Sequence, residues 1–155
     1  MSHADVDVSL SSYVPGVHAI RDGHVIRAGA VVPALRGRDP EQTLWVGPFT
    51  TVQGTIQHAG SVMLARGSVT WDGIRAGLQV VIGADCTVDG PIHCDGNVVV
   101  QDGAKVRGAI TAGSDVHLLG KCHVQDVTCQ GDVFITGAPQ TGALTPSGRI
   151  QTRSW

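Results

Sequence analysis

The stretch AKVRGAITAGSDVHLLGK, residues 104–121, decides the fold, because its pattern of side chains recurs every eighteen residues in the second half of the chain. Each copy opens on a small residue, and the residue two positions further on is mostly valine. The first column reads Thr50, Ser68, Cys86, Ala104 and Cys122, and the second reads Val52, Thr70, Val88, Val106 and Val124. A fixed period of this kind is typical of a solenoid, in which neighbouring turns stack and share one core.

Each repeat contains three such pairs of apolar positions. Residues two positions apart lie on the same side of a strand, so each pair marks the inner face of one short strand. The second pair reads Ile56, Ile74, Ile92, Ile110 and, after a one-residue deletion, Val127, beside His58, Ala76, Cys94, Ala112 and Cys129. The third reads Val62, Val80, Val98, Val116 and Val133, beside Leu64, Ile82, Val100, Leu118 and Ile135. Three strands per turn predict an all-β protein, a single-stranded β-helix solenoid of triangular cross-section with 18 residues per turn.

The regular pattern also predicts the organisation of the chain. We expect a β-helix over residues 24–137, flanked by an N-terminal tail at 1–23 and a C-terminal tail at 138–155. Within the β-helix, residues 44–137 form regular turns, and counting back eighteen residues predicts a partial turn before them, with Ile26 beside Leu44 and Val32 beside Thr50. That partial turn covers residues 24–34, and the stretch 35–43 is expected to be a polar loop without strand character, because it contains Arg36, Arg38, Asp39, Pro40 and Glu41.

Composition restricts the function classes. A hydrophobic content of 42% with only 4% aromatic residues describes a narrow core of valine and isoleucine. The formal net charge of −2 and the scattered Lys and Arg residues argue against a nucleic-acid partner. No run approaches the ~18 apolar residues of a membrane span, and the stretch Met1 to Ser12 is polar where a signal peptide would be basic and then apolar. We therefore expect a cytoplasmic protein.

The four cysteines favour a core role over a disulfide or a zinc site. Cys86 and Cys122 share one column with Ala104 between them, and Cys94 shares another with Cys129. Turns about 4.8 Å apart would separate each pair by about 9.6 Å, beyond the ~7 Å limit for a disulfide. We interpret these cysteines as small core hydrophobes.

The histidines raise the alternative that the protein is a metal enzyme. His93, His117 and His123 each lie between two inward residues, so they are expected to point outward, on three different faces of the prism. One subunit cannot gather them, and a shared zinc would need neighbouring subunits. His58 falls in an inward column and is expected to be a neutral, hydrogen-bonded histidine. We expect no metal site, no cofactor and no catalytic residue.

The repeat unit resembles that of the bactofilins, the polymer-forming cytoskeletal proteins. The resemblance rests on Gly103–Ile110 (GAKVRGAI), Ala84–Ile92 (ADCTVDGPI) and Val52–Ile56 (VQGTI), and it covers roughly residues 44–137. It implies a right-handed β-helix that stacks end to end into nucleotide-independent filaments, with cell-envelope proteins or the inner face of the membrane as further partners. The N-terminal stretch lacks the short apolar segment found in many bactofilins, and residues 1–43 are longer than a simple tail.

Three functions from different classes stay open. The first is a structural protein that self-assembles, and its polymer interface is expected at Val133, Phe134 and Ile135, because the regular pattern ends there. The second is a hexapeptide-repeat enzyme, an acyltransferase or a γ-class carbonic anhydrase, since these families share the eighteen-residue turn. The third is a scaffold that does not polymerise.

Outward apolar residues are the last feature of the sequence. Four of them fall in the first two regular turns, at Trp45, Phe49, Val69 and Trp71. A lone solenoid presents mostly polar side chains on its flanks, so these residues predict either a cover formed by the N-terminal segment or a lateral contact with a partner.

Overall fold

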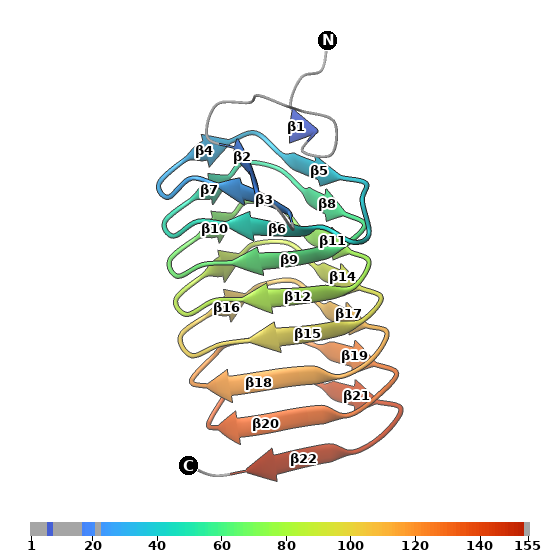
Figure 1. Cartoon of the computed structure of the whole chain (residues 1–155). Helices are drawn as coiled ribbons and strands as arrows, with labels where there is room; N and C mark the ends of the chain where they lie inside the picture. Colours follow the sequence, from blue (N-terminus) through green and yellow to red (C-terminus); the bar gives the residue numbers. More distant parts are fainter. Residues whose placement is uncertain (1–5, 8–16, 21–22, 154–155) are drawn as a thin grey trace.

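The structure, a computed structural model, describes residues 6–7, 17–20 and 23–153, and these residues form strands and turns without a helix. The strands stack into three sheets along one axis, which confirms the predicted β-solenoid of triangular cross-section (Figure 1). All neighbouring strands are parallel except one pair near the N-terminus.

Face 1 of the prism is a five-stranded sheet of two-residue strands. In order along the axis it comprises β4 (Val31–Val32), β7 (Thr51–Val52), β10 (Val69–Thr70), β13 (Thr87–Val88) and β16 (Lys105–Val106). Isolated bridges from Lys105 to His123 and from His123 to Gln140 continue this face for two more turns.

Face 2 is an eight-stranded parallel sheet. It comprises β1 (Val6–Asp7), β5 (Leu35–Gly37), β8 (Ile56–His58), β11 (Ile74–Ala76), β14 (Ile92–Cys94), β17 (Ile110–Ala112), β19 (Val127–Cys129) and β21 (Leu144–Pro146).

Face 3 is a nine-stranded sheet with the longest strands. It comprises β2 (Val17–Ile20), β3 (Gly23–Ile26), β6 (Thr43–Val46), β9 (Ser61–Leu64), β12 (Gln79–Ile82), β15 (Asn97–Val100), β18 (Val116–Gly120), β20 (Val133–Gly137) and β22 (Ile150–Arg153). In Figure 1 these strands cross the front from right to left, and those of face 2 run behind from left to right as the chain descends. This course is that of a right-handed helix.

The core consists of ladders of like side chains, as the sequence predicts. Ile56, Ile74, Ile92 and Ile110 are register partners on face 2, and each is at most 2% exposed. The spacing falls from eighteen to seventeen residues between Ile110 and Val127, where the one-residue deletion was expected. Burying each such side chain stabilises the fold by roughly 1.5–3 kcal/mol relative to leaving it exposed.

The first turn corrects two predictions made from the sequence. The expected loop begins with strand β5, in which Leu35 is 1% exposed and pairs with Ile56. Arg36 does not break this strand, because its side chain projects outward between two inward residues. The irregular part is confined to residues 38–42. These extra residues lengthen the turn and change its register. Ile26 therefore lies beside Val46 and not beside Leu44, and Val32 lies beside Val52 and not beside Thr50.

The two expected tails also contain strands. At the C-terminus, β21 and β22 complete another turn on face 2 and face 3, with a spacing of seventeen residues, so residues 138–153 belong to the solenoid. At the N-terminus, β1 pairs with β5, and β2 pairs antiparallel with β3. The rest of the expected N-terminal tail, residues 1–5, 8–16 and 21–22, lies outside the described residues, as do residues 154–155.

One corner of the prism, between face 3 and face 1, requires a left-handed backbone in every turn. Seven residues with positive φ fall there, and five of them are glycine: Gly29, Phe49, Gly67, Asp85, Gly103, Gly120 and Gly137. Glycine adopts this region without steric cost, which accounts for the five glycines at this corner.

Candidate assembly surfaces

The C-terminal end of the solenoid lies one turn beyond the expected polymer interface. Val133, Phe134 and Ile135 in β20 pair with residues of β22, and the Val133 N–H donates to the Arg149 carbonyl at 2.9 Å. The prediction that these three residues form the terminal edge is therefore wrong, because the chain itself occupies that edge. The open edge of face 3 is β22 (Figure 1).

Strand β22 presents half of its backbone groups to the open end. Backbone N–H and C=O groups of successive strand residues point to opposite sides of the strand, and Arg149 bonds to β20. The backbone groups of Ile150 and Thr152 therefore point away from β20. No described residue pairs with β22 on that side. The Ile150 side chain, at the end of the Val133 column, is 48% exposed.

The N-terminal end is built differently on each face. Strand β4 is the terminal strand of face 1, and its Val31 is 62% exposed. On face 2 the terminal strand is β1, which runs parallel to its neighbour. On face 3 it is β2, which runs antiparallel to β3 and so reverses the strand direction at this end.

The outward residues predicted as a lateral contact do not form one surface. Trp45 lies on face 3 and is 39% exposed, and Trp71 lies beyond β10 at face 1 and is 56% exposed, with Val69 on β10 itself. Phe49 occupies the left-handed corner between these faces, above Gly67, and is 65% exposed. The cover by the N-terminal segment stays a prediction, because residues 1–5, 8–16 and 21–22 lie outside the described residues.

The structure reveals an apolar column that the sequence pattern did not bring to attention. It consists of the outward residues on face 3, each paired with the next by strand register: Val25, Trp45, Met63, Val81, Val99, His117 and Phe134. We call it the face 3 stripe. The signal was present in the sequence, since each member is the residue between the two inward positions of the third pair.

The histidines lie where the sequence predicts them. His93 is on face 2, His117 on face 3 and His123 on face 1. Within the described residues no three His, Cys, Asp or Glu side chains are grouped to hold a metal ion. The His117 ring instead stacks on Phe134, with ring centroids 4.7 Å apart and an interplanar angle of 11°.

His58 is a core residue at the N-terminal end of face 2. It is 5% exposed, and its Nε2 lies 2.8 Å from the Gln42 carbonyl oxygen. Because a carbonyl only accepts, Nε2 carries the proton, as expected for a hydrogen-bonded core histidine. The imidazole occupies the space where a side chain on Gly37 would lie. Its Nδ1 is buried without a hydrogen-bond partner among the described residues.

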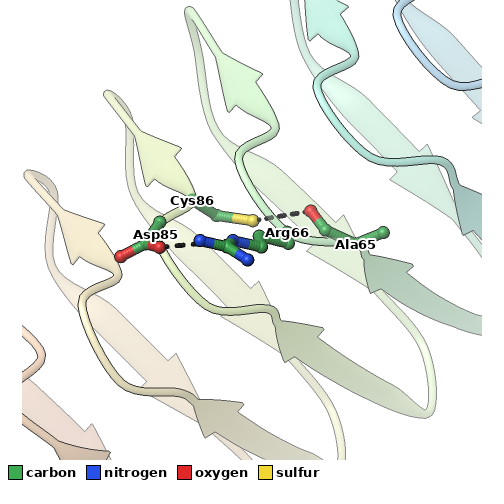
Figure 2. A network of polar contacts seen from close by, with 4 residues as sticks. All are labelled: Ala65, Arg66, Asp85 and Cys86. Carbon is green, nitrogen blue, oxygen red and sulfur yellow. Dashed lines mark hydrogen bonds and ion pairs between the residues drawn. The ribbon is translucent and has the colours of Figure 1, made fainter.

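The four cysteines are free thiols in the core, in the columns that the sequence predicts. Burial raises the pKa of each thiol, and it raises that of Cys122 to about 11. Figure 2 shows the Cys86 thiol donating to the Ala65 carbonyl at 2.9 Å, beside the ion pair of Arg66 and Asp85 at 3.5 Å. The side chains of this ion pair are largely exposed, so the pair contributes little to the stability of this corner.

A shallow groove of about 570 Å³ crosses the N-terminal half of face 2. Its lining includes the outward residues Arg36, Gln57, Arg75 and His93, together with Asp95. The groove is a partly basic strip of the prism surface, and its Arg36 also interacts within the chain.

Comparisons of this chain with family models, with curated proteins and with solved structures find no match. Within the described residues no helix has the length and hydrophobicity to cross a membrane. The architecture defines the class: a parallel β-solenoid whose terminal strands have one unpaired edge among the described residues, with a mainly apolar column on face 3.

Proposed function

We propose that this chain is a structural protein that assembles end to end by stacking one β-solenoid on the next, without nucleotide. The observation that carries the proposal is strand β22, whose outer edge is unpaired among the described residues and whose Ile150 is 48% exposed. An unpaired strand edge is a template for another strand. The resemblance of the repeat to bactofilins supports the same function.

End-to-end contact would use the same interactions that join the turns of one solenoid, namely backbone hydrogen bonds between strands and burial of apolar side chains. A second subunit at this end would bond to the free backbone groups of Ile150 and Thr152 and cover the exposed Ile150 side chain. Contacts between ends that do not close into a ring produce a filament. We propose that such a filament lies in the cytoplasm, with cell-envelope proteins or the inner membrane surface as further partners, as the resemblance implies.

The test is electron microscopy and sedimentation of the purified protein without nucleotide. We expect filaments from the parent chain and short soluble species from Ile150→Lys, because the substitution places a charge at the junction. Thr152→Pro should also give short soluble species. Proline removes the N–H of residue 152, which points away from β20 toward the open end, and it leaves the bonds of β22 to β20 in place. Thr128→Lys, which places the same charge outward on the flank of face 2, is the matched control and should still polymerise.

The alternative functions predict other results. A hexapeptide-repeat enzyme or a scaffold that does not polymerise would give discrete particles from the parent chain at all concentrations. Filaments that persist unchanged in both Ile150→Lys and Thr152→Pro would show that β22 is not the contact. Circular dichroism of each variant must retain the β signal of the parent for the comparison to count.

A further inference from the structure

The face 3 stripe is a continuous strip on the outside of the solenoid, and it is apolar except at His117. Its seven members lie one above the other through direct register pairs from β3 to β20. Trp45 is 39% exposed, and Met63, Val81 and Val99 are partly exposed although they point away from the core. At its C-terminal end the stripe closes with the stacked rings of His117 and Phe134.

The other two faces do not share this property. The outward column of face 2 is polar along its described length, and it reads Arg36, Gln57, Arg75, His93, Thr111, Thr128 and Thr145. On face 1 the corresponding column alternates between polar and apolar residues, from Val31 and Thr51 to Lys105 and His123. An apolar ladder is therefore a specific feature of one flank and not a general consequence of the repeat.

The charges in and around the stripe indicate which kind of partner contacts it. No member of the stripe is an acid, a lysine or an arginine, so two copies of the stripe can meet without repulsion. On its face 2 side the stripe is bordered by the corner residues Asn97, Asp115 and Asp132, which stack through side-chain to backbone hydrogen bonds. This border carries two carboxylates, and at the opposite corner Arg66 and Lys121 lie beside Asp85 and Asp102, so the surroundings of the stripe do not form the cationic surface that contact with an anionic lipid surface would need. A second copy of the same flat face is the occupant that fits.

The size of the stripe indicates how such a contact would act. Six steps of about 4.8 Å give a length of roughly 29 Å, and one outward side chain per strand gives a width of roughly 7 Å. The resulting patch of about 200 Å² is a quarter of the ~800 Å² that each partner contributes to a stable interface. One pair of subunits would hold only weakly, whereas many pairs along two filaments would add their contacts.

We propose that the face 3 stripe is a lateral contact through which filaments of this chain pair face to face, with stripe against stripe. The proposal rests on the end-to-end assembly proposed above, because it is the filament that multiplies a weak contact. Face-to-face sheets pack about 10 Å apart, and we propose a symmetric contact whose two-fold axis passes through the centre of the stripe, so that Val81 lies opposite Val81 of the second copy.

The first test is a charge placed in the middle of the stripe. In electron micrographs we expect paired or bundled filaments from the parent chain and from Thr111→Glu, which places the same charge on face 2. Val81→Glu should give long single filaments with an unchanged thermal unfolding transition, because Val81 points outward. Bundles of Val81→Glu equal to those of the parent would overturn the lateral contact while leaving end-to-end assembly intact.

The second test does not need filaments to be visible. A bismaleimide that spans about 10 Å should link subunits of Val81→Cys in high yield and those of Thr111→Cys in low yield. The four native thiols are buried and have raised pKa values, so the reagent selects the introduced cysteine. Equal yields from the two variants would overturn the proposal. Selective linking of Val81→Cys in a protein that forms no filaments would support the contact and overturn end-to-end assembly.

Discussion

The backbone at the corners of the solenoid is held by single aspartate and glycine residues that lie outside the core ladders. Asp102 and Asp115 each accept a hydrogen bond from a backbone N–H one turn later, that of Lys121 and that of Asp132, at 2.8 Å. Each of these carboxylates lies against a glycine of the next turn, so a side chain there would collide with it. The aspartate and the glycine form a matched pair, and the pair recurs at five positions: Asp85 with Gly103, Asp102 with Gly120, Asp115 with Gly131, Asp126 with Gly142 and Asp132 with Gly148.

The first prediction separates backbone strain from steric collision at the left-handed corner. Gly29 has φ of 73°, and a methyl group on its Cα would meet no atom within 4 Å. Gly120 has φ of 65°, and a methyl group there would lie 2.7 Å from Asp102 Cβ. Gly29→Ala should cost roughly 1–2 kcal/mol of stability through strain alone. Gly120→Ala should cost about 1–3 kcal/mol more, because the corner is overpacked.

Urea unfolding of the two variants checks this difference. The substitution Asp102→Gly should cost less in the Gly120→Ala background than in the parent chain, since it removes the carboxylate that the methyl meets as well as the acceptor of the Lys121 N–H. Equal losses in Gly29→Ala and Gly120→Ala would show that the carboxylate does not fix this corner.

The second prediction concerns the pH dependence of stability above neutrality. Burial raises the pKa of the Cys122 thiol from 9.0 to about 11, so the folded chain retains a proton that the unfolded chain releases. The corresponding stability is fully present below pH 9 and is lost as the pH rises toward 11. The free energy of unfolding, measured in urea, should therefore be lower at pH 10 than at pH 8.

Cys122→Ala is the natural control, because Ala104 occupies the same column one turn earlier. Its free energy of unfolding should fall less steeply between pH 8 and pH 10, by up to about 1.4 kcal/mol per pH unit for a single thiol. An identical slope in both proteins would mean that Cys122 ionises as readily in the folded chain as in the unfolded one.

At the scale of the strands, the regular turns were predictable because each inner column repeats one kind of side chain. Ile56, Ile74, Ile92 and Ile110 form a ladder in the structure just as they form a column in the sequence. The alternation of buried and outward residues has a period of two, so one correctly placed column fixes the direction of every neighbouring side chain. The faces of His93, His117 and His123 followed from this rule.

The ends were not predictable, because the repeat length changes there. The turn before Thr43 is longer than eighteen residues and the last turns are shorter, so counting in eighteens loses the register at both ends. Gly142 and Gly148 suggested a tail, yet they are the corner partners of Asp126 and Asp132. Pro146 also suggested a tail, but it lies in β21, the terminal strand of face 2, where a missing N–H is tolerated.

The candidate surfaces were predictable only in part, for a related reason. Trp45 and Trp71 stood out as large outward residues, and their positions beside the third and the first pair of columns already place them on different faces. The face 3 stripe is made mostly of valine and methionine, which attract no attention singly. It becomes visible only when the outward position of each turn is read as a column, as the inward positions were.

At the scale of the molecule, stacking makes the solenoid nearly one-dimensional, because each turn pairs only with the turn before and the turn after. Stability should then be a sum over turns, and a complete turn should be removable. Deleting residues 86–103 joins Asp85 to Ala104 and replaces one corner residue of positive φ, Gly103, with another, Asp85. Every inner column keeps its register across this joint.

The third prediction is that the eighteen-residue deletion folds and the nine-residue deletion of 86–94 does not. Removing one turn should keep a cooperative transition and a β-rich circular dichroism spectrum, with stability lower by roughly 1–3 kcal/mol for the lost residues. The shorter deletion removes one strand of face 1 and one of face 2, shifts the face 3 residues that follow toward their positions and places corner residues in the core, so it should lose the cooperative transition. Thermal unfolding followed by circular dichroism distinguishes the two. If both deletions fold equally well, the columns do not set the register, and the core would have to be held by something other than its ladders.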